Sequence, residues 1–305
     1  AGAPARSAMT DEYTQADAWI EAARPKTLGA SVSPVLVGTA LALGHGGSHL
    51  PAAGCALAGA LLIQIATNFA NDYFDYLKGA DTAERKGPLR AAQSGLVEPI
   101  QVLRASLVTF LLVFLPGSYI VWRGGWPFIV IGLLSVVSGI LYTAGPYPLA
   151  YTGLADLFVL VFFGPVAVVG TYYLQTLELR TAPFVASLGP GLLAVALLTV
   201  NNLRDADEDR KANKKTLAVR FGRGFARAEY VFCVVAACVA VPVYFYVREA
   251  ELWFMLTPAV LIFLAAPAIR AVFFRRDGPA LNRALARTGG MLLLFSILFS
   301  LGWIL

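Results

Sequence analysis

The sequence has little charge and very few cysteine or histidine side chains. Charged residues make up 14% of its 305 residues, and there are three cysteines and two histidines. A soluble domain typically carries about 25% charged residues, so the composition excludes an ordinary soluble protein. Cys55, Cys233 and Cys238 fall within apolar runs without metal-binding spacing, which indicates buried, unreactive thiols. His45 and His49 stand in the segment GHGGSH, where a glycine-rich loop is favoured over a metal site.

What the sequence contains instead is a series of long apolar runs. Hydrophobic residues form 58% of the chain, and the mean hydropathy is +0.67. Runs of about 20 apolar residues recur, and each is long enough to cross a hydrocarbon core of ~30 Å. The sequence therefore predicts an all-α, polytopic membrane protein with nine transmembrane helices. The expected spans are residues 28–44, 51–74, 102–121, 126–143, 154–174, 184–203, 226–246, 252–274 and 285–305.

The basic residues are concentrated in alternate connections between these spans. Of the 24 Lys and Arg residues, only Arg123, Arg180 and Arg248 lie on one side of the expected topology. The positive-inside rule then places the N-terminus in the cytoplasm and the C-terminus outside. Because the cations flank spans as topology requires, the net charge of +5 does not indicate nucleic-acid binding. Residues 1–9 are expected to be a remnant of expression, and residues 10–305 are expected to form one transmembrane domain.

A group of polar side chains, which we call the second ladder, follows the apolar run PGLLAVALLTV. Asn201, Asp205 and Asp209 stand four residues apart, so on a helix they project from one face. Carboxylates stacked in this way repel one another, and a divalent cation with oxygen ligands is the usual partner. The cations that follow the second ladder are Arg210, Lys211, Lys214, Lys215 and Arg220.

The first ladder ends the second apolar span. It is a polar stripe on one helix face, at positions i, i+4, i+8 and i+11. Its members are Gln64, Asn68, Asp72 and Asp75, with Asn71 adjoining. Acidic residues at a helix C-terminus oppose the macrodipole, so a ladder that merely ends the helix in water is the less favoured alternative. The loop that follows, residues 78–99, supplies Asp81 and the cations Lys78, Arg85, Lys86 and Arg90.

Several further polar residues stand at or near the ends of the expected spans. Arg24 and Lys26 stand before the first span, where they either set the topology or bind an anion. Tyr142 ends the fourth span and is either a membrane-belt aromatic or a wall of an active site, and Asp156 lies early in the fifth span. A kink is expected at the segment FFGP, residues 162–165. The last three spans carry no charge between their ends, and we expect no chemistry there.

The two ladders lie at the same expected membrane depth and can converge on one metal cluster. Mg²⁺ prefers carboxylate oxygens, keeps several waters and binds substrate phosphates. A diphosphate on a lipid tail fits such a site, with its head at the cytoplasmic rim and its tail between the helices. Metal neutralises the leaving diphosphate, and Lys or Arg stabilises the charge that develops on it. An allylic diphosphate then gives a carbocation, which a central, aromatic-walled cavity protects from water.

The segments around both ladders resemble the two signature motifs of a known family. They are NDYFD, KGAD and GPLR around the first ladder, and NNLRDADEDR and KKTLAVRFG around the second. They are similar to the motifs of the UbiA superfamily of intramembrane aromatic prenyltransferases, whose nine-span, N-in layout agrees with nearly the whole chain. Within the superfamily, the forms K-G-x-D and N-N-x-R-D look most like the 1,4-dihydroxy-2-naphthoate polyprenyltransferase branch (MenA type).

The resemblance implies a Mg²⁺-dependent reaction in a bacterial inner membrane, with the active site facing the cytoplasm. A polyprenyl diphosphate ionises, and its allylic carbon is attacked by the electron-rich ring of dihydroxynaphthoate. Carboxylate is lost from the attacked carbon. The implied products are demethylmenaquinol, CO₂ and diphosphate, which makes the reaction a step of menaquinone biosynthesis.

The resemblance also implies roles for individual residues. The implied metal and catalytic residues are Asn68, Asp72 and Asp75 in a first site and Asp205 and Asp209 in a second. Lys214 is expected to bind the diphosphate. The other implied substrate-binding residues are Arg24, Lys26, Asn71, Lys78, Arg90, Asn201 and Asn202, with Tyr142 and Asp156 on the acceptor side. One departure is Gly79, where the superfamily often has a third acidic residue, and Asp81 is the candidate to replace it.

Three alternatives stay open. Another member of the superfamily would use the same metal site with a different aromatic or lipid acceptor. A secondary transporter or lipid flippase also places charges near broken helices, although usually near the midplane and with internal repeats. A non-catalytic structural membrane protein would not need two matched ladders.

Overall fold

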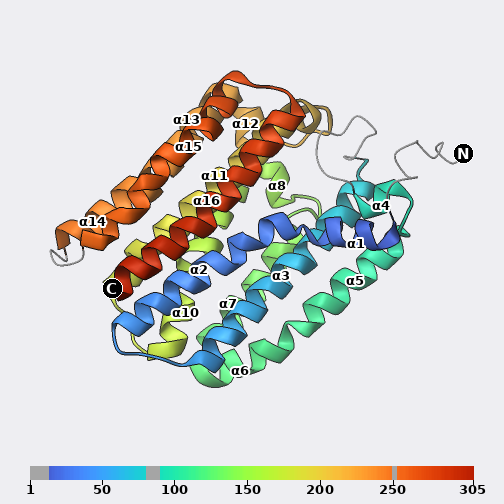
Figure 1. The fold of residues 1–305 in the computed structure, drawn as a ribbon. Coiled ribbons are helices and arrows are strands. Elements are labelled where there is room, and N and C mark those ends of the chain that lie inside the picture. Colours follow the sequence, from blue (N-terminus) through green and yellow to red (C-terminus); the bar gives the residue numbers. More distant parts are fainter. Residues whose placement is uncertain (1–13, 80–89, 249–252) are drawn as a thin grey trace, which may run out of the picture.

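The chain is folded into helices, without a β-strand, in all the parts that the structure describes (Figure 1). A computed structural model describes residues 14–79, 90–248 and 253–305. The first half contains α1 Gln15–Ala23, α2 Pro25–Gly44, α3 Leu50–Leu77, α4 Ala91–Ser94, α5 Pro99–Leu112, α6 Phe114–Gly124, α7 Pro127–Leu141 and α8 Leu149–Thr152. The second half contains α9 Ala155–Val161, η2 Phe162–Val166, α10 Ala167–Thr176, α11 Thr181–Lys211, α12 Leu217–Arg220, α13 Gly222–Val235, η3 Ala236–Ala240, α14 Val241–Arg248, η4 Trp253–Val260, α15 Leu261–Phe274 and α16 Gly278–Ile304.

Among the described residues, eight helices are long and apolar enough to cross a membrane. They are Gln15–Gly44, Leu50–Leu77, Pro99–Gly124, Ala155–Thr176, Thr181–Lys211, Gly222–Arg248, Leu256–Phe274 and Gly278–Ile304. The expected fourth span corresponds to the shorter apolar helix α7, which has 15 residues. At 1.5 Å per residue α7 reaches about 22 Å, which is less than a hydrocarbon core of ~30 Å. The polytopic helical fold is therefore confirmed, while the number of nine spans stays a prediction.

The chain turns sharply between α1 and the first long helix, α2. Thr14 begins α1 with a capping box, in which its hydroxyl accepts from the backbone of Asp17 and the Asp17 carboxylate accepts from the backbone of Thr14. Arg24 ends α1 in the left-handed conformation, at φ 55°, and Pro25 starts α2 at the position where a missing N–H is tolerated. Helix α1 consequently packs against α3 and α4. It lies beside the end of α3 that carries the first ladder (Figure 1).

The expected kink in the fifth span is confirmed. A π-helical turn, η2, separates α9 from α10, and Gly164 within it has non-helical angles of φ −101° and ψ −106°. Pro165 cannot donate a backbone hydrogen bond, which explains why the helix is interrupted there. A side chain on Gly164 would meet the backbone oxygen of Ser187 at 3.0 Å, so glycine lets the kinked segment approach α11.

Helix α11 is central to the main hydrophobic core. Of its most apolar stretch 72% is buried, compared with 22% for α3. Small residues allow neighbouring helices to come close, since a side chain on Gly189 would overlap the ring of Phe295 on α16. This packing holds α11 against its neighbours, and the second ladder stands in the last turns of the helix.

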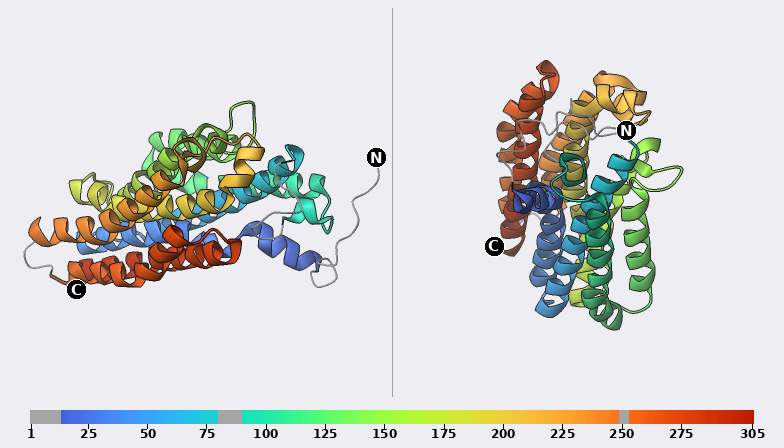
Figure 2. Two further views of the ribbon diagram at one scale, coloured as in Figure 1. Left: turned by 90° about the horizontal axis from the view of Figure 1, so that it is seen from above. Right: turned by 90° about the vertical axis from the view of Figure 1, so that its right-hand side faces the viewer.

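Helices α2 and α10 connect two groups of helices. Both contact α3, which also packs against α5, α6 and α7, and both contact α11, which also packs against α9, α13 and α16. Helix α16 packs against α2 and α15 as well. Figure 2 shows the long helices side by side along one direction. Helices α2 and α10 therefore position the two ladder-bearing helices, α3 and α11, relative to one another.

Candidate functional site

Asp75 is the residue at which the segments of the two ladders meet. Its side chain is buried and accepts hydrogen bonds from Arg90 Nη2 and Lys214 Nζ, each at 3.0 Å. Arg90 directly precedes α4, whereas Lys214 follows α11 and lies 139 residues along the chain from Asp75. Hydrogen bonds between charged partners are stronger than those between neutral ones. The structure therefore joins the first ladder to the basic segment behind the second ladder through buried ion pairs.

Asp72 holds the short helix α4. One carboxylate oxygen accepts from the backbone N–H of Ala91 at 2.9 Å, and the other accepts from that of Ala92 at 3.2 Å. These N–H groups have no partner within α4, so the fully buried Asp72 satisfies them. Arg90 is the residue that caps the same helix, and by holding α4 in place Asp72 positions Arg90 beside Asp75.

The amide side chains of the first ladder attach α3 to its neighbours. Asn68 Nδ2 donates to the last backbone carbonyl of α1 at 3.0 Å, and Gln64 Nε2 donates to a carbonyl in the first turn of α2 at 3.3 Å. The adjoining Asn71 accepts from the hydroxyl of Thr143 at 2.9 Å. The polar stripe predicted along α3 therefore faces other protein elements and not lipid.

Arg204 organises the second ladder on α11. Its Nε and Nη2 donate to the two carboxylate oxygens of Asp205, each at 2.6 Å. Nη2 also donates to the side chain of Asn201, and Nη1 donates to that of Asn282 on α16, both at 2.8 Å. Arg204 was not singled out from the sequence, although the N-N-x-R-D motif contains it, because adjacent residues on a helix normally face apart.

Asp209 differs from the other aspartates of the two ladders, since its carboxylate has no hydrogen bond to any described side chain or backbone group. It is 9% exposed and interacts electrostatically with Lys214, Asp205 and Asp75. Its backbone carbonyl accepts from the Lys214 N–H at 2.8 Å, which keeps Lys214 beside the end of α11. The carboxylates of both ladders and Lys214 therefore share one electrostatic environment.

Tyr151, on α8, is a second residue that the sequence analysis did not single out. The Nζ atoms of Lys78 and Lys214 lie 4.7 Å and 5.1 Å from the centre of its ring. Lys78 also donates to the backbone carbonyl of Thr143. Partial desolvation lowers the pKa of Lys78, and the Asp75 carboxylate opposes that shift. The ring thus gathers one lysine from each motif, and nothing in the local sequence distinguishes Tyr151 from the neighbouring, exposed Tyr147.

The two cations before the first span behave differently. Arg24 interacts electrostatically with Asp75, so its left-handed position between α1 and α2 directs it toward the site. The side chain of Lys26 is 74% exposed, and its Nζ lies 3.8 Å from Oε1 of Glu21. Lys26 is therefore a surface residue at the same end of the protein. The structure brings Arg24 to the ladders and leaves Lys26 at the surface.

Tyr142 and Asp156, the residues predicted for the acceptor side, interact electrostatically with each other. Tyr142 is half-buried, and its phenol is also influenced by Arg24, Asp75 and Asp209. Asn202 is buried on α11 beside the second ladder. Asp156 is buried too, but no other residue donates a hydrogen bond to its carboxylate within the ranges described.

Asp156 opens into a cavity of about 450 Å³ between α9, α11 and α13. Glu229 of α13 lines the same cavity and accepts a hydrogen bond from the hydroxyl of Thr199 at 3.3 Å. Glu229 is a correction to the sequence analysis, which expected no charge between the ends of the last three spans. It lies almost two turns inside α13, and its partner is on α11.

Some of the predicted residues contribute no described contact with the ladders. Asp81, Arg85 and Lys86 lie outside the described residues, as do residues 1–9. Arg210, Lys211, Lys215 and Arg220 have exposed side chains at the ends of α11 and α12. The two histidines are loop residues, as expected: His49 caps α3, and His45 Nδ1 lies 3.0 Å from the hydroxyl of Tyr172. Cys233 and Cys238 are buried and Cys55 is half-buried.

The site offers oxygen ligands of the type that Mg²⁺ prefers, namely the carboxylates of Asp75, Asp205 and Asp209. In the described part of the chain, no three His, Cys, Asp or Glu side chains are gathered closely enough to hold a metal ion as they stand. Asp75 and Asp205 are instead paired with cations, whereas Asp209 has no such hydrogen bond. The donor chemistry fits a magnesium site, in which arginine and lysine hold the carboxylates of Asp75 and Asp205.

Comparison with known proteins identifies the family of the chain. A profile of the UbiA prenyltransferase family matches residues 31–299. A protein of Escherichia coli (strain K12) named 1,4-dihydroxy-2-naphthoate octaprenyltransferase is 38% identical, covering 96% of this chain and 97% of that protein. Its namesake in Mycobacterium tuberculosis is 35% identical, covering 92% and 94%.

The fold is also similar to that of a UbiA homologue from Archaeoglobus fulgidus, solved with GPP and Mg²⁺ bound. The TM-score is 0.67 at 16% identity, covering 94% of this chain and 99% of the other. The family profile spans most of the chain, and the relatives extend over nearly its whole length. The resemblance seen in the two motifs is thereby confirmed, and the chain belongs to the UbiA prenyltransferase family.

Proposed function

We propose that this prenyltransferase transfers a polyprenyl group from polyprenyl diphosphate to 1,4-dihydroxy-2-naphthoate, with loss of the acceptor's carboxylate as CO₂. The product would be demethylmenaquinol, a precursor of menaquinone. The observation that carries the proposal is the buried contact of Asp75 with Arg90 and Lys214, which unites the two motif segments in one site. The names of the relatives support the choice of acceptor.

The cations of the site bind the diphosphate. Lys214 and Arg90 already lie at 3.0 Å from Asp75, so they need only exchange a carboxylate for a phosphate oxygen. Arg24 and Lys78 add positive charge on the same side. Stabilising the charge that develops on the leaving group is usually the largest catalytic contribution that fixed cations make.

Asp75, Asp205 and Asp209 are the residues that would hold Mg²⁺. When bound there, the ion would supply positive charge to neutralise the leaving diphosphate. Asn68 and Asp72, which the sequence also assigns to the metal, act by fixing α1 and α4 around this site. Arg204 holds Asp205 in one orientation, and Asn201 accepts a further hydrogen bond from the same guanidinium group.

The reaction balances without an additional reagent. The allylic carbon–oxygen bond of the donor breaks, and its electron pair leaves with the diphosphate. The ring carbon that bears the carboxylate bonds to the allylic carbon. The electron pair of the carbon–carboxylate bond then restores the aromatic ring as CO₂ departs. We assign Tyr142 to the acceptor side, since its phenol is influenced by Asp156 and Arg24 and by the ladder residues Asp75 and Asp209.

We further propose that the protein is a multi-pass protein of a bacterial inner membrane with this site facing the cytoplasm. The distribution of Lys and Arg supports the orientation, because the ladder ends of α3 and α11 lie beside the most basic connections.

Product analysis with the purified protein tests the proposal. The protein is supplied with Mg²⁺, a polyprenyl diphosphate and dihydroxynaphthoate labelled at the carboxylate carbon. We expect labelled CO₂ to appear in step with prenylated product, as measured by scintillation counting and mass spectrometry. A product that keeps the label would contradict the proposed branch and indicate another aromatic acceptor chemistry. Substrate exchange across vesicles without any product would favour a transporter.

A further inference from the structure

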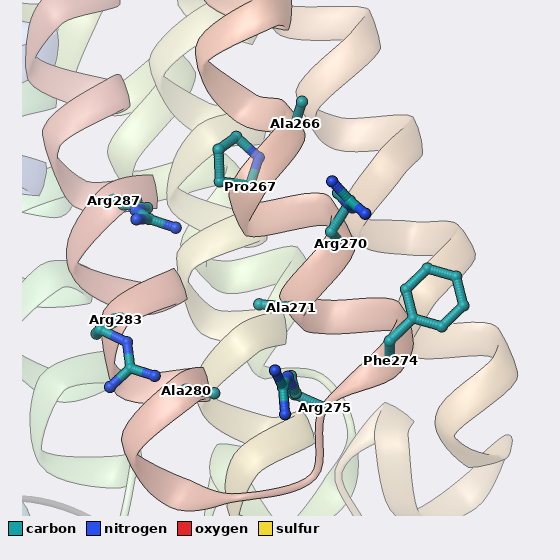
Figure 3. Close-up of a pocket in the computed structure, with 9 residues that line it drawn as sticks. All are labelled: Ala266, Pro267, Arg270, Ala271, Phe274, Arg275, Ala280, Arg283 and Arg287. Carbon is teal, nitrogen blue, oxygen red and sulfur yellow. The ribbon is translucent and has the colours of Figure 1, made fainter.

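A second basic region lies away from the ladders, around a cavity of about 570 Å³ between α15 and α16. Arg270 and Arg275 stand on the α15 side, and Arg283 and Arg287 stand on the α16 side (Figure 3). The sequence analysis expected no chemistry in these spans, because the grouping of the four arginines depends on how two helices pack. Positive charge at helix ends is expected from topology alone, but its convergence around a cavity is not.

The four guanidinium groups have no carboxylate partner among the residues that the structure describes. All four residues are exposed, and none forms an ion pair with the rest of the described chain. The nearest acid in the sequence, Asp277, is occupied in capping α16, where it accepts from the backbone of Ala280 at 3.1 Å. Arginine presents a planar fork of donors that matches a phosphate group, whereas lysine offers only a point charge. The cavity therefore favours a phosphate-bearing anion.

The length of α16 points to a position for the cavity at the depth of lipid head groups. Helix α16 has 27 residues, which gives it a length of about 40 Å, and it exceeds a hydrocarbon core of ~30 Å by roughly two turns. Arg283 stands in its second turn, and Arg287 follows one turn later on the same face. Such residues reach the boundary between head groups and acyl chains, where arginine extends its charge toward phosphate.

The rest of the cavity wall is apolar, and it continues into an exposed apolar surface of α15. Ala266, Pro267 and Phe274 line the cavity on the α15 side. Phe274 is 81% exposed, and Phe263 on the same helix is 77% exposed. A ligand with a phosphate head and hydrocarbon chains would contact both the arginines and the apolar wall of the cavity. A small soluble phosphate would leave the apolar wall uncovered.

The cavity lies at the same end of the molecule as the second ladder. Asn282, next to Arg283, accepts a hydrogen bond from Arg204, which in turn holds Asp205. The leaflet that faces the cavity is therefore the leaflet next to the ladders, whichever side of the membrane that is.

We propose that the cavity between α15 and α16 binds an anionic phospholipid, with its phosphate among the four arginines and its acyl chains against α15. The inference is independent of the proposed acceptor and of the metal site. It assigns this surface to a structural lipid of the surrounding membrane, distinct from the prenyl donor.

Native mass spectrometry of the full-length protein in detergent tests the proposal, with dioleoyl phosphatidylglycerol and dioleoyl phosphatidylcholine as probes. The informative variant is the double substitution Arg283→Gln and Arg287→Gln. The matched control is Arg104→Gln with Arg276→Gln, which removes the same charge at exposed positions that do not line the cavity. We expect the intact protein to retain phosphatidylglycerol about tenfold more than phosphatidylcholine, with this preference lost in the first variant and kept in the control.

A third variant tests the contribution of the apolar wall to lipid binding without changing the charge of the protein. Ala266→Phe fills the apolar wall while keeping all four arginines, and it should also reduce phosphatidylglycerol retention. Equal losses in the arginine variant and its control would overturn the proposal, because net charge alone would then explain the preference. Displacement of the lipid by millimolar inorganic phosphate would also overturn it, since the site would then belong to a soluble anion.

Discussion

The two ladders are built from similar side chains, but the protein uses them differently. The first ladder, on α3, is tied to distant parts of the chain: Asp72 holds α4, and Asp75 pairs with Arg90 and Lys214. The second ladder, on α11, is tied locally, since Asp205 pairs with its neighbour Arg204. Asp209 is left without a hydrogen bond from the described residues. The first ladder thus joins distant segments of the chain, and the second contains a carboxylate, Asp209, that no described residue holds by a hydrogen bond.

Because of this difference, substitutions in the two ladders should have different effects on the stability of the protein. Removing one partner of a buried ion pair costs stability because the other charge is left uncompensated. Removing a buried carboxylate that has no partner relieves a desolvation cost. Our proposal needs both kinds of residue for catalysis. An Asp→Asn substitution in either ladder should therefore abolish activity to a similar extent, while the two variants should differ in their free energy of unfolding.

The largest effect is expected for Asp75→Asn compared with Asp209→Asn. Asp75→Asn leaves Arg90 and Lys214 without their buried carboxylate and should lower the free energy of unfolding by about 3–5 kcal/mol. Asp209→Asn should leave it unchanged or slightly higher. Both should reduce prenyl transfer by at least about 100-fold, as expected when a group that stabilises transition-state charge is lost. Denaturation in detergent and a product assay measure the two quantities.

Asp207→Asn is the matched control for these substitutions. Asp207 also lies near the end of α11, but its side chain is 57% exposed and pairs with Arg223. It should keep both stability and activity close to those of the parent protein. If Asp209→Asn proved as destabilising as Asp75→Asn, the contrast between the ladders would be wrong.

Asp72→Ala should have a smaller and more local effect. It removes the acceptor of two backbone N–H groups of α4 and should cost about 1–2 kcal/mol, like the loss of an N-cap. Hydrogen exchange should rise in residues 91–94 before it rises in α3, and Arg90 should lose its position beside Asp75. Exchange that stays slow in α4 would show that Asp72 does not hold it.

Removal of metal should abolish turnover without unfolding the protein. Asp75 and Asp205 have cation partners in this structure, so chelation by EDTA should leave the melting temperature unchanged. Adding Mg²⁺ together with diphosphate should raise it, because ligands that bind only the folded state stabilise it. A large drop in melting temperature on chelation would mean that the cations do not replace the metal.

The smallest effect is expected for Tyr151→Leu, with Tyr151→Phe as its control. Leucine removes the ring that lies near Lys78 and Lys214, whereas phenylalanine keeps it. A contact of about 0.5–1 kcal/mol should appear as a two- to fivefold rise in KM for the prenyl diphosphate in the leucine variant alone. Equal effects of both variants would assign the role to the hydroxyl group.

Local features of the sequence predicted much of this molecule. The period of the ladders shows directly in the spacing of Asp72 and Asp75 on one helix and of Asp205 and Asp209 on the other. The kink at Gly164 follows from glycine and proline within an apolar run. Both depend on residues within a few positions of one another, which is the range over which helical periodicity and backbone restrictions act.

Contacts between distant segments could not be predicted in the same way. The pairing of Asp75 with Lys214 depends on how α2 and α10 position α3 and α11. The arginine cavity depends likewise on the packing of α15 against α16. Arg204 was visible in the motif, but its contact with Asp205 arises from a long side chain that folds back along the helix.

Binding of a non-reacting prenyl diphosphate analogue, measured by titration calorimetry with Mg²⁺, tests most directly whether both ladders serve one site. The account predicts one analogue per chain for the parent protein and for Asp207→Asn. It predicts that Asp75→Asn and Asp209→Asn each lose this Mg²⁺-dependent binding. Unchanged binding in either of the last two variants would contradict a site shared by α3 and α11.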